Sequence, residues 1–399
     1  MRPRAAVLLV LTATAVASNF TNYGALIPLL RSELAVGSGA IGLISTLLYV
    51  GIGATYLLGG MLADRVGSRQ VLLVALALIG CGGVAMAFVH ELWWVLLWRT
   101  AIGIGAGTAI TACGRYASQM GRMAPLGQGL FGGAMQAGAA AGLFLTPPLA
   151  TLLGTWGVFQ FWGMIALVAW ALWLTLESNP RRRAPAPRTI GAAFAHPQLR
   201  RVGIATLGTL GVGQAVAPWL AVYCAHRFGL SIAAAATLGG ASLFIGTASR
   251  PLGGLLAARG VDVYVLMRVG ATASAVGLLA LALPAGGPAL APLGLVLLAA
   301  GTTLPYAAAL SEGARLGREA GVGAGTGQGV VATFSAPASA FGPPLIGLLY
   351  GLEGSFGVAF GVVAGMAGAA VWAARRQPSH VSNRMLGAPR PMSAGEVAR

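Results

Sequence analysis

Two arginines, Arg99 and Arg250, stand inside long apolar runs of this sequence. A charged side chain within a membrane-length apolar run is costly, so it usually contacts a ligand or braces neighbouring helices. A guanidinium can donate two parallel hydrogen bonds to a carboxylate or a nitrate. Arg250 precedes Arg259 by nine residues, about 13 Å along a helix, which places it near the middle of a bilayer. Arg250 therefore predicts an anion-binding residue, with a guanidinium satisfied by backbone carbonyls as the alternative.

Arg99 opens the stretch RTAIGIGAG, in which Gly103, Gly105 and Gly107 follow at alternate positions. Glycines allow a neighbouring helix to approach closely. Arg99 lies about 12 Å below the end of its helix, where close packing would bring backbone carbonyls or Asn19 within its reach. Two roles therefore stay open for Arg99, which are bracing the bundle and assisting a ligand.

Further polar side chains fall on helical faces within the apolar runs. Asn19, Asn22 and Tyr23 share one face because they are spaced at i, i+3 and i+4. We expect a set of secondary substrate contacts, although an interhelical hydrogen bond is the alternative role of each member. The set comprises Asn19, Asn22, Tyr23, Gln136, Gln214, Thr303 and Tyr306.

The middle of each apolar run lacks acidic residues. The Asp and Glu residues fall in loops or at the ends of runs. A buried carboxylate whose pKa is raised by burial is a common proton carrier in membrane transport. We therefore expect exchange, uniport or a proton carried by the substrate rather than proton coupling through a carboxylate.

Catalytic chemistry has little support in the sequence. Four histidines lie in loops or in the C-terminal tail without metal-binding spacing, and the chain has no lysine to cradle a phosphate. The three cysteines, Cys81, Cys113 and Cys224, lie in apolar runs and are expected to be reduced. We expect no enzymatic activity, no metal and no cofactor.

The composition is that of an integral membrane protein. The chain is 57% hydrophobic and 9% charged, whereas a soluble domain carries roughly 25% charged residues. Helices are the expected spanning elements because their backbone hydrogen bonds close within each segment. The sequence predicts an all-α membrane protein with spans at 7–29, 39–61, 71–89, 93–113, 128–152, 156–176, 203–225, 234–256, 263–284, 290–310, 325–350 and 355–374.

The arginines predict the orientation of these twelve helices. All 25 basic residues are arginines, and a cytoplasmic N-terminus leaves only Arg31 and Arg227 in segments on the outer side. The positive-inside rule therefore places both termini in the cytoplasm. Because the arginines are scattered over many segments rather than gathered on one face, nucleic-acid binding is not expected.

The chain divides into two similar halves. GGMLADRVG at 59–67 resembles GGLLAARGV at 253–261, and GQG occurs at 127–129 and again at 327–329. Such a parallel repeat predicts two pseudo-symmetric six-helix bundles with a site at their interface near the membrane midplane. The predicted domains are an N-terminal bundle at 1–176, a cytoplasmic linker at 177–201, a C-terminal bundle at 202–376 and a disordered cytoplasmic tail at 377–399.

The stretch GGMLADRVGSRQ at 59–70 follows the second predicted span. It resembles the signature of the major facilitator superfamily through Gly60, Asp64, Arg65, Gly67 and Arg69. The resemblance implies that the three charges form a latch closing the cytoplasmic ends of the two bundles. Asp64 can accept hydrogen bonds from arginines or from a helix N-terminus across the seam, and Gly60 allows close approach. The alternative is that these residues only maintain topology and solubilise a turn.

The resemblance extends to both arginines of the apolar runs. Arg99 with Gly103 and Gly107 is similar to a second signature of the superfamily. Arg250, followed by Pro and two glycines, is similar to the anion-binding arginine of monocarboxylate, oxalate and nitrate carriers, and the first, fourth, seventh and tenth spans line the cavity in this family.

The resemblance implies a monomeric carrier, with the lipid bilayer as its surroundings, that moves a small organic or inorganic anion by alternating access across a bacterial plasma membrane. One alternative is an exporter of amphipathic drugs or neutral metabolites. Another is a membrane receptor or scaffold that transports nothing.

Overall fold

The computed structural model describes residues 3–36, 38–88, 90–175, 190–283 and 290–375, and the regular elements in these ranges are helices. The main helices of the first half are α1 (Pro3–Thr21), α2 (Ile27–Glu33), α3 (Ser38–Val66), α4 (Ser68–Ala85), α5 (Leu92–Ser118), α6 (Ala124–Phe144) and α7 (Thr146–Leu174). Those of the second half are α8 (Ile190–Ala195), α9 (Pro197–Thr206), α10 (Val212–Val216), α11 (Leu220–Phe228), α12 (Ile232–Ala258), α13 (Val263–Ala282), α14 (Leu290–Thr303), α15 (Tyr306–Glu319), α16 (Ala324–Thr333), α17 (Ala336–Glu353) and α18 (Gly357–Ala373).

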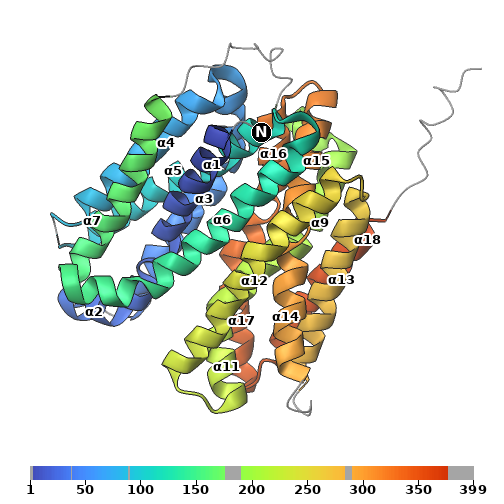
Figure 1. The fold of residues 1–399 in the computed structure, drawn as a ribbon. Coiled ribbons are helices and arrows are strands. Elements are labelled where there is room, and N and C mark those ends of the chain that lie inside the picture. Colours follow the sequence, from blue (N-terminus) through green and yellow to red (C-terminus); the bar gives the residue numbers. More distant parts are fainter. Residues whose placement is uncertain (1–2, 37, 89, 176–189, 284–289, 376–399) are drawn as a thin grey trace, which may run out of the picture.

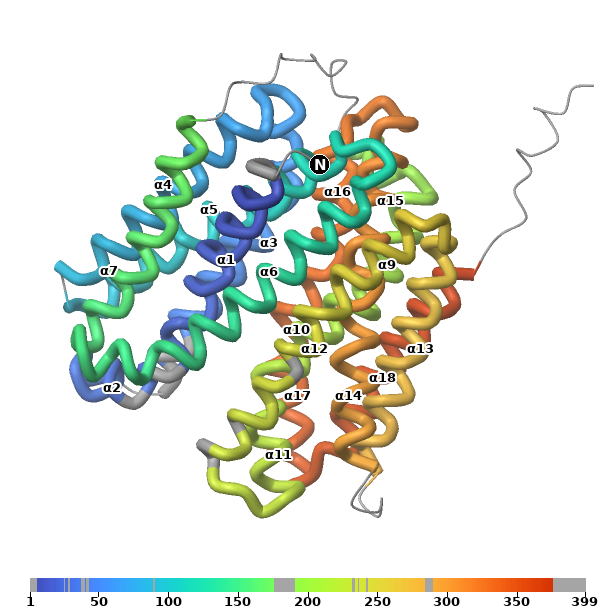
Figure 2. Tube along the Cα trace, in the orientation of Figure 1, coloured from blue at the N-terminus to red at the C-terminus, as the bar shows by residue number. Residues whose placement is uncertain are grey.

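The helices form two bundles that follow the two halves of the chain (Figure 1). The blue-to-green helices gather on one side and the yellow-to-red helices on the other. Helix α6 runs beside α12 across the middle of the molecule (Figure 2), and α3 packs against α16. At the end that carries the 66–68 turn the bundles meet, whereas α2 and α11 lie far apart at the opposite end. The start of α1 and the end of α18 both lie at the closed end.

The all-helical membrane architecture is confirmed. Among the described residues, eight helical segments are long and apolar enough to cross a bilayer, and two shorter apolar helices accompany them. The count of twelve spans and the cytoplasmic side of the termini stay predictions. Residues 176–189 of the predicted linker and residues 376–399 of the predicted tail lie outside the described residues.

Several predicted spans are interrupted or end elsewhere. The first span breaks after Thr21 into a 3-10 turn and α2. The fifth ends at Phe144, because a new helix begins at Thr146 with Pro147 and Pro148 in its first turn, and proline suits a first turn but breaks a helix interior. Helix α9 begins at Pro197, inside the predicted linker.

Glycine seams draw the helices together within each bundle. A methyl group at Gly103 of α5 would lie 2.2 Å from the carbonyl oxygen of Leu48 in α3, and one at Gly107 would lie 2.3 Å from that of Ile52. Contact this close excludes any side chain at these two positions. Close packing of this kind is what drives helices to associate in lipid. The glycines of the Arg99 motif therefore hold α5 against α3.

Candidate functional site

Arg250 lies at the contact between the two bundles. Its side chain belongs to α12 and is 6% exposed. The Nη1 group donates a hydrogen bond of 3.0 Å to the carbonyl oxygen of Gly132 in α6. The guanidinium carbon also lies 4.2 Å from the ring centroid of Tyr306, at the start of α15. Arg250 thus joins α12 both to the opposite bundle and to α15 of its own bundle.

The positive charge of Arg250 has no acidic partner among the residues that the structure describes. The ion pairs there join Arg115 to Asp64 and Arg315 to Glu312 and Glu319. The Nε–H of Arg250 is buried without an acceptor. A buried charge without compensation costs several kcal/mol or shifts its ionisation. The charge of Arg250 is therefore uncompensated in the described residues.

Arg99 is fully buried and, like Arg250, has neither an acidic partner nor an acceptor for its Nε–H among the described residues, but both of its Nη groups have acceptors. Its Nη1 group donates to the carbonyl oxygen of Asn19 at 2.8 Å and to Oδ1 of Asn22 at 3.2 Å. Its Nη2 group donates to the carbonyl oxygen of Phe20 at 3.4 Å. The two carbonyls lie in the last turn of α1, which is the negative end of the helix dipole. Of the two roles that the sequence leaves open for Arg99, these contacts favour bracing.

The polar face of the first span surrounds Arg99 rather than Arg250. Asn19 Nδ2 donates to the carbonyls of Ala15 at 2.8 Å and Trp162 at 3.2 Å. The ring of Tyr23 lies 4.7 Å from the Arg99 guanidinium carbon. As substrate contacts, Asn19, Asn22 and Tyr23 stay predictions, and their described contacts join α1 to α5 and α7.

Thr303 and Tyr306 are brought to Arg250. The Thr303 hydroxyl is hydrogen-bonded to that of Ser249, the residue before Arg250, and donates to the carbonyl of Ala299 at 2.6 Å. Tyr306 is buried beneath the guanidinium, and its hydroxyl lies beside the side chain of Gln128. Tyr306 therefore contacts Arg250 directly, whereas Thr303 contacts the residue before it.

Gln136 and Gln214 lie elsewhere along the seam. A methyl group at Gly246 of α12 would be 2.5 Å from Gln136 Nε2, so this glutamine packs on α12 one turn before Arg250. Gln214 of α10 accepts a hydrogen bond from the hydroxyl of Ser339 in α17. Gln136 thus neighbours the Arg250 site, whereas Gln214 contacts both α17 of its own bundle and Tyr56 of α3 in the opposite bundle.

The sequence analysis missed two buried glutamines, Gln128 of α6 and Gln328 of α16. Each is 1% exposed, and neither amide has a hydrogen-bond partner for its oxygen or its nitrogen. Both pack on Gly114 of α5. The repeated GQG triplet was the available signal, but it was taken only as evidence that the two halves are alike.

Asp64 connects the bundles at the closed end. Its Oδ1 accepts from the backbone N–H of Gly325 at 3.1 Å, and its Oδ2 accepts from the N–H and the hydroxyl of Thr326 at 2.8 and 3.0 Å. Asp64 therefore caps the N-terminus of α16, where a negative charge is favourable. A methyl group at Gly60 would lie 2.1 Å from the carbonyl oxygen of Gly325, so only glycine fits this crossing.

The other two charges of the motif do not cross the seam in the described contacts. Arg65 is exposed. Arg69 donates to the carbonyls of Trp173 at 3.0 Å and Leu174 at 2.9 Å, at the end of α7 in its own bundle. The cation beside Asp64 is instead Arg115 of α5, whose Nε lies 2.8 Å from Oδ1. In the described contacts Asp64 crosses the seam and Arg115 pairs with it, while a latch role for Arg65 and Arg69 stays a prediction.

Substitution of Arg69 and of Arg65 should have different effects on the thermal stability of the protein. Arg69→Ala removes two charge-assisted hydrogen bonds to the end of α7 and should lower Tm by roughly 3 °C. Arg65→Ala, at an exposed position, is the matched control and should leave Tm within about 1 °C. Thermal unfolding of both purified variants measures this, and equal Tm values for the two would contradict the bonding of Arg69.

The acidic residue Glu312 is more buried than its predicted place at a span end implies. Helix α15 continues to Glu319, so Glu312 lies inside it at 7% exposure. Arg315 pairs with it through two hydrogen bonds of 2.8 and 2.6 Å. This paired carboxylate lies beyond the predicted tenth span, on the side of the 66–68 turn.

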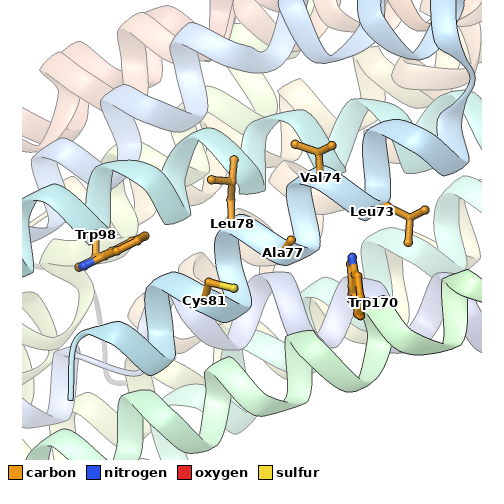
Figure 3. A pocket seen from close by; sticks show the side chains of 7 residues that line it. All are labelled: Leu73, Val74, Ala77, Leu78, Cys81, Trp98 and Trp170. Atoms are coloured by element: carbon orange, nitrogen blue, oxygen red, sulfur yellow. The ribbon is translucent and has the colours of Figure 1, made fainter. Parts of the chain in front are cut away.

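An apolar groove of about 450 Å³ opens on α4, between Trp98 of α5 and Trp170 of α7 (Figure 3). Its other lining residues are Leu73, Val74, Ala77, Leu78 and Cys81. Side chains of this kind suit contact with lipid acyl chains. The groove contains neither Arg250 nor the residues around it.

Comparison with known proteins identifies the fold and the family. The model of the Major Facilitator Superfamily matches residues 8–328. An uncharacterized MFS-type transporter of Mycobacterium tuberculosis is 33% identical over 129 residues, which cover 31% of this chain and 28% of that protein. A probable sulfoacetate transporter of Cupriavidus necator is 27% identical over 126 residues, which cover 32% and 29%. The chain thus matches less than a third of the length of these curated relatives.

Solved structures match over nearly the whole chain. The human organic anion transporter MFSD10 aligns with a TM-score of 0.73 at 18% identity, covering 94% of this chain and 100% of that one. The transporter FucP in the outward conformation aligns with a TM-score of 0.76 at 17% identity, covering 95% and 99%. At these identities the similarity shows the fold alone. The matched family and these proteins are transporters rather than enzymes.

Proposed function

The chain belongs to the major facilitator superfamily, and from that premise we propose that it is a transporter that carries a small organic or inorganic anion by alternating access. The observation that carries this proposal is Arg250, a buried cation at the contact of the two bundles with no acidic partner in the described residues. An anion that enters between the bundles would supply the missing charge and accept from the free N–H groups.

The contrast between the two buried arginines supports this assignment. Arg99 has carbonyl and amide oxygens on its Nη groups, so a ligand would have to displace acceptors already in place. Arg250 has one hydrogen bond in the part of the chain that the structure describes, to Gly132, and, like Arg99, it lies over an aromatic ring. A ligand at Arg250 therefore adds interactions without removing any.

The substrates named for two similar proteins are compatible with an anionic substrate for this chain. One similar protein is a probable sulfoacetate transporter, and one similar structure is an organic anion transporter. Others are symporters of the neutral sugars fucose and xylose. We take the unpaired charge of Arg250, rather than these names, as the ground for an anionic substrate.

The closed end supports the alternating-access part of the proposal. Asp64 ties α3 to α16 there, while the bundles diverge toward α2 and α11 (Figure 1). With the predicted orientation the closed end faces the cytoplasm, so this conformation is open outward. Release of the Asp64 contacts would let the cytoplasmic end open. We place the transporter in a bacterial plasma membrane, acting as a monomer.

Ligand-induced thermal stabilisation of the purified protein tests the substrate class. A ligand at a hundred times its Kd adds about 2.7 kcal/mol to the stability of the native state. We expect at least one of acetate, lactate, nitrate, oxalate and sulfoacetate to raise Tm, and fucose and the cation tetraphenylphosphonium to leave it unchanged.

Two arginine variants of the same helix make this test specific. Arg250→Gln should abolish the anion-induced shift, whereas Arg259→Gln, at the exposed end of α12, should keep it. If fucose or the cation alone stabilises the protein and Arg250→Gln responds as the wild type does, the anion proposal fails and the exporter of neutral or amphipathic compounds replaces it.

A further inference from the structure

Two unpartnered amides meet at the seam between the bundles. Gln128 and Gln328 are each 1% exposed, and none of their four polar side-chain atoms has a partner with hydrogen-bond geometry among the residues that the structure describes. Buried polar groups are nearly always satisfied in native proteins. An unpaired amide at a moving interface therefore points to a partner that is present only during part of the transport cycle.

The two glutamines occupy equivalent places in the two halves. They are the middle residues of GQG at 127–129 and at 327–329. A methyl group at Gly114 would lie 2.4 Å from Gln328 Oε1 and 3.2 Å from Gln128 Nε2, so both amides face the same spot on α5. The repeat thus brings one amide from each bundle to a shared position.

This position adjoins the Arg250 site on the side of the closed end. Gln128 lies one helical turn, about 6 Å, from Gly132, whose carbonyl accepts from Arg250. Tyr306 spans the interval, because its ring lies under Arg250 and its hydroxyl lies within interaction distance of the side chain of Gln128. Toward the closed end, Gln328 lies three residues after Gly325 in α16, a rise of about 4.5 Å along the helix. The N–H of Gly325 donates to Asp64.

The chemistry of these groups differs from that of Arg250. A guanidinium only donates hydrogen bonds, whereas a carboxamide donates through nitrogen and accepts through oxygen, and a phenol does both. A simple carboxylate or nitrate has no proton for an amide oxygen. A hydroxyl group can donate to one amide oxygen and accept from an amide N–H or from the phenol.

We propose that Gln128, Gln328 and Tyr306 bind a hydroxyl group of the substrate, so that the substrate is a small hydroxylated carboxylate or sulfonate with its anionic group on Arg250. This inference rests on the proposed function. Because the amides are buried beneath the Asp64 contacts, the hydroxyl engages them as the halves separate at that end.

Matched anion pairs test the proposal without any variant. The pairs are 3-hydroxybutyrate with butyrate and 2-hydroxyethanesulfonate with ethanesulfonate, each differing by one hydroxyl. Apparent Kd values are measured by thermal stabilisation of the full chain, and inhibition constants by competition for uptake into proteoliposomes. In at least one pair the hydroxylated anion should bind tenfold more tightly or better, since a site built for a hydroxyl discriminates strongly against its absence.

Substitutions then assign the preference to the amides. Gln128→Met and Gln328→Met keep the length of the side chain and should reduce the preference to less than threefold by weakening the hydroxylated anion alone. Gln198→Met, at an exposed position of α9, should retain the full preference. Arg250→Gln should weaken both members of each pair.

The outcomes separate this inference from the proposed function. If anions bind but wild type shows no preference for the hydroxyl, or both Met variants keep it, the amide pair is structural and this inference fails while the anion carrier stands. If no anion of the panel binds, the proposed function fails and the inference fails with it.

Discussion

Asp64→Asn should slow transport about tenfold or more and open the closed end of the molecule. Asp64 accepts three hydrogen bonds from Gly325 and Thr326 of the opposite bundle and pairs with Arg115. An asparagine brings an N–H group against these donors and removes the charge that compensates Arg115. Breaking one partner of a buried pair costs about 3–5 kcal/mol, enough to shift a two-state conformational equilibrium by two orders of magnitude or more.

Two measurements check this expectation. Uptake into proteoliposomes gives the rate, and spin labels at Arg65→Cys and Arg318→Cys on a background without native cysteines report the separation of the bundles. Both label positions are exposed and lie at the closed end, one in each half. The mean label distance should increase in Asp64→Asn.

A matched carboxylate provides the control. Asp262 also caps a helix N-terminus, but it accepts from Tyr264 of its own helix at 2.8 Å. Asp262→Asn should therefore lower Tm slightly and leave both the rate and the label distance unchanged. A transport rate that is unaffected by Asp64→Asn would exclude Asp64 as the gate and would leave the receptor or scaffold reading open.

Arg99→Leu should lower Tm by more than about 10 °C, because the substitution leaves several buried acceptors unpaired at once. The carbonyls of Asn19 and Phe20 and the Oδ1 of Asn22 receive their hydrogen bonds from this guanidinium. They lie where α1 breaks, so no further helical turn is present to satisfy the two carbonyls. Arg99→Lys should recover little, since one ammonium cannot match the spread of a guanidinium.

Arg250→Leu is the matched comparison, and it should leave Tm unchanged or raise it. Arg250 is 6% exposed, but in the described residues its charge is not compensated by an acid and one backbone carbonyl alone accepts from it. Replacing an uncompensated buried charge with an apolar side chain removes a desolvation cost. Thermal unfolding of both variants without ligand measures this contrast. Equal and large losses would show that Arg250 also braces the fold.

Local properties of the sequence were sufficient for the general architecture. Apolarity over about 20 residues is a property of each segment alone, so the all-helical membrane class could be predicted before any contact was known. The acceptor role of Asp64 toward an arginine and a helix N-terminus also followed from the chemistry of a lone carboxylate at a bundle end. Arg99 and Arg250 were identifiable because charges inside apolar runs are rare.

The partners of these residues were decided by the tertiary structure. Asp64 meets Arg115 across 51 positions and Thr326 across 262, and no local pattern encodes which helix faces come together at such separations. The break after Thr21 turns the end of α1 into the acceptor for Arg99. The difference between Arg99, which has acceptors on both Nη groups, and Arg250, which has one carbonyl acceptor in the described residues, arises only when the helices pack, as does the meeting of Gln128 with Gln328 on Gly114. Hydrophobicity acts on each segment wherever it lies, whereas hydrogen bonds and ion pairs depend on the directions that packing imposes.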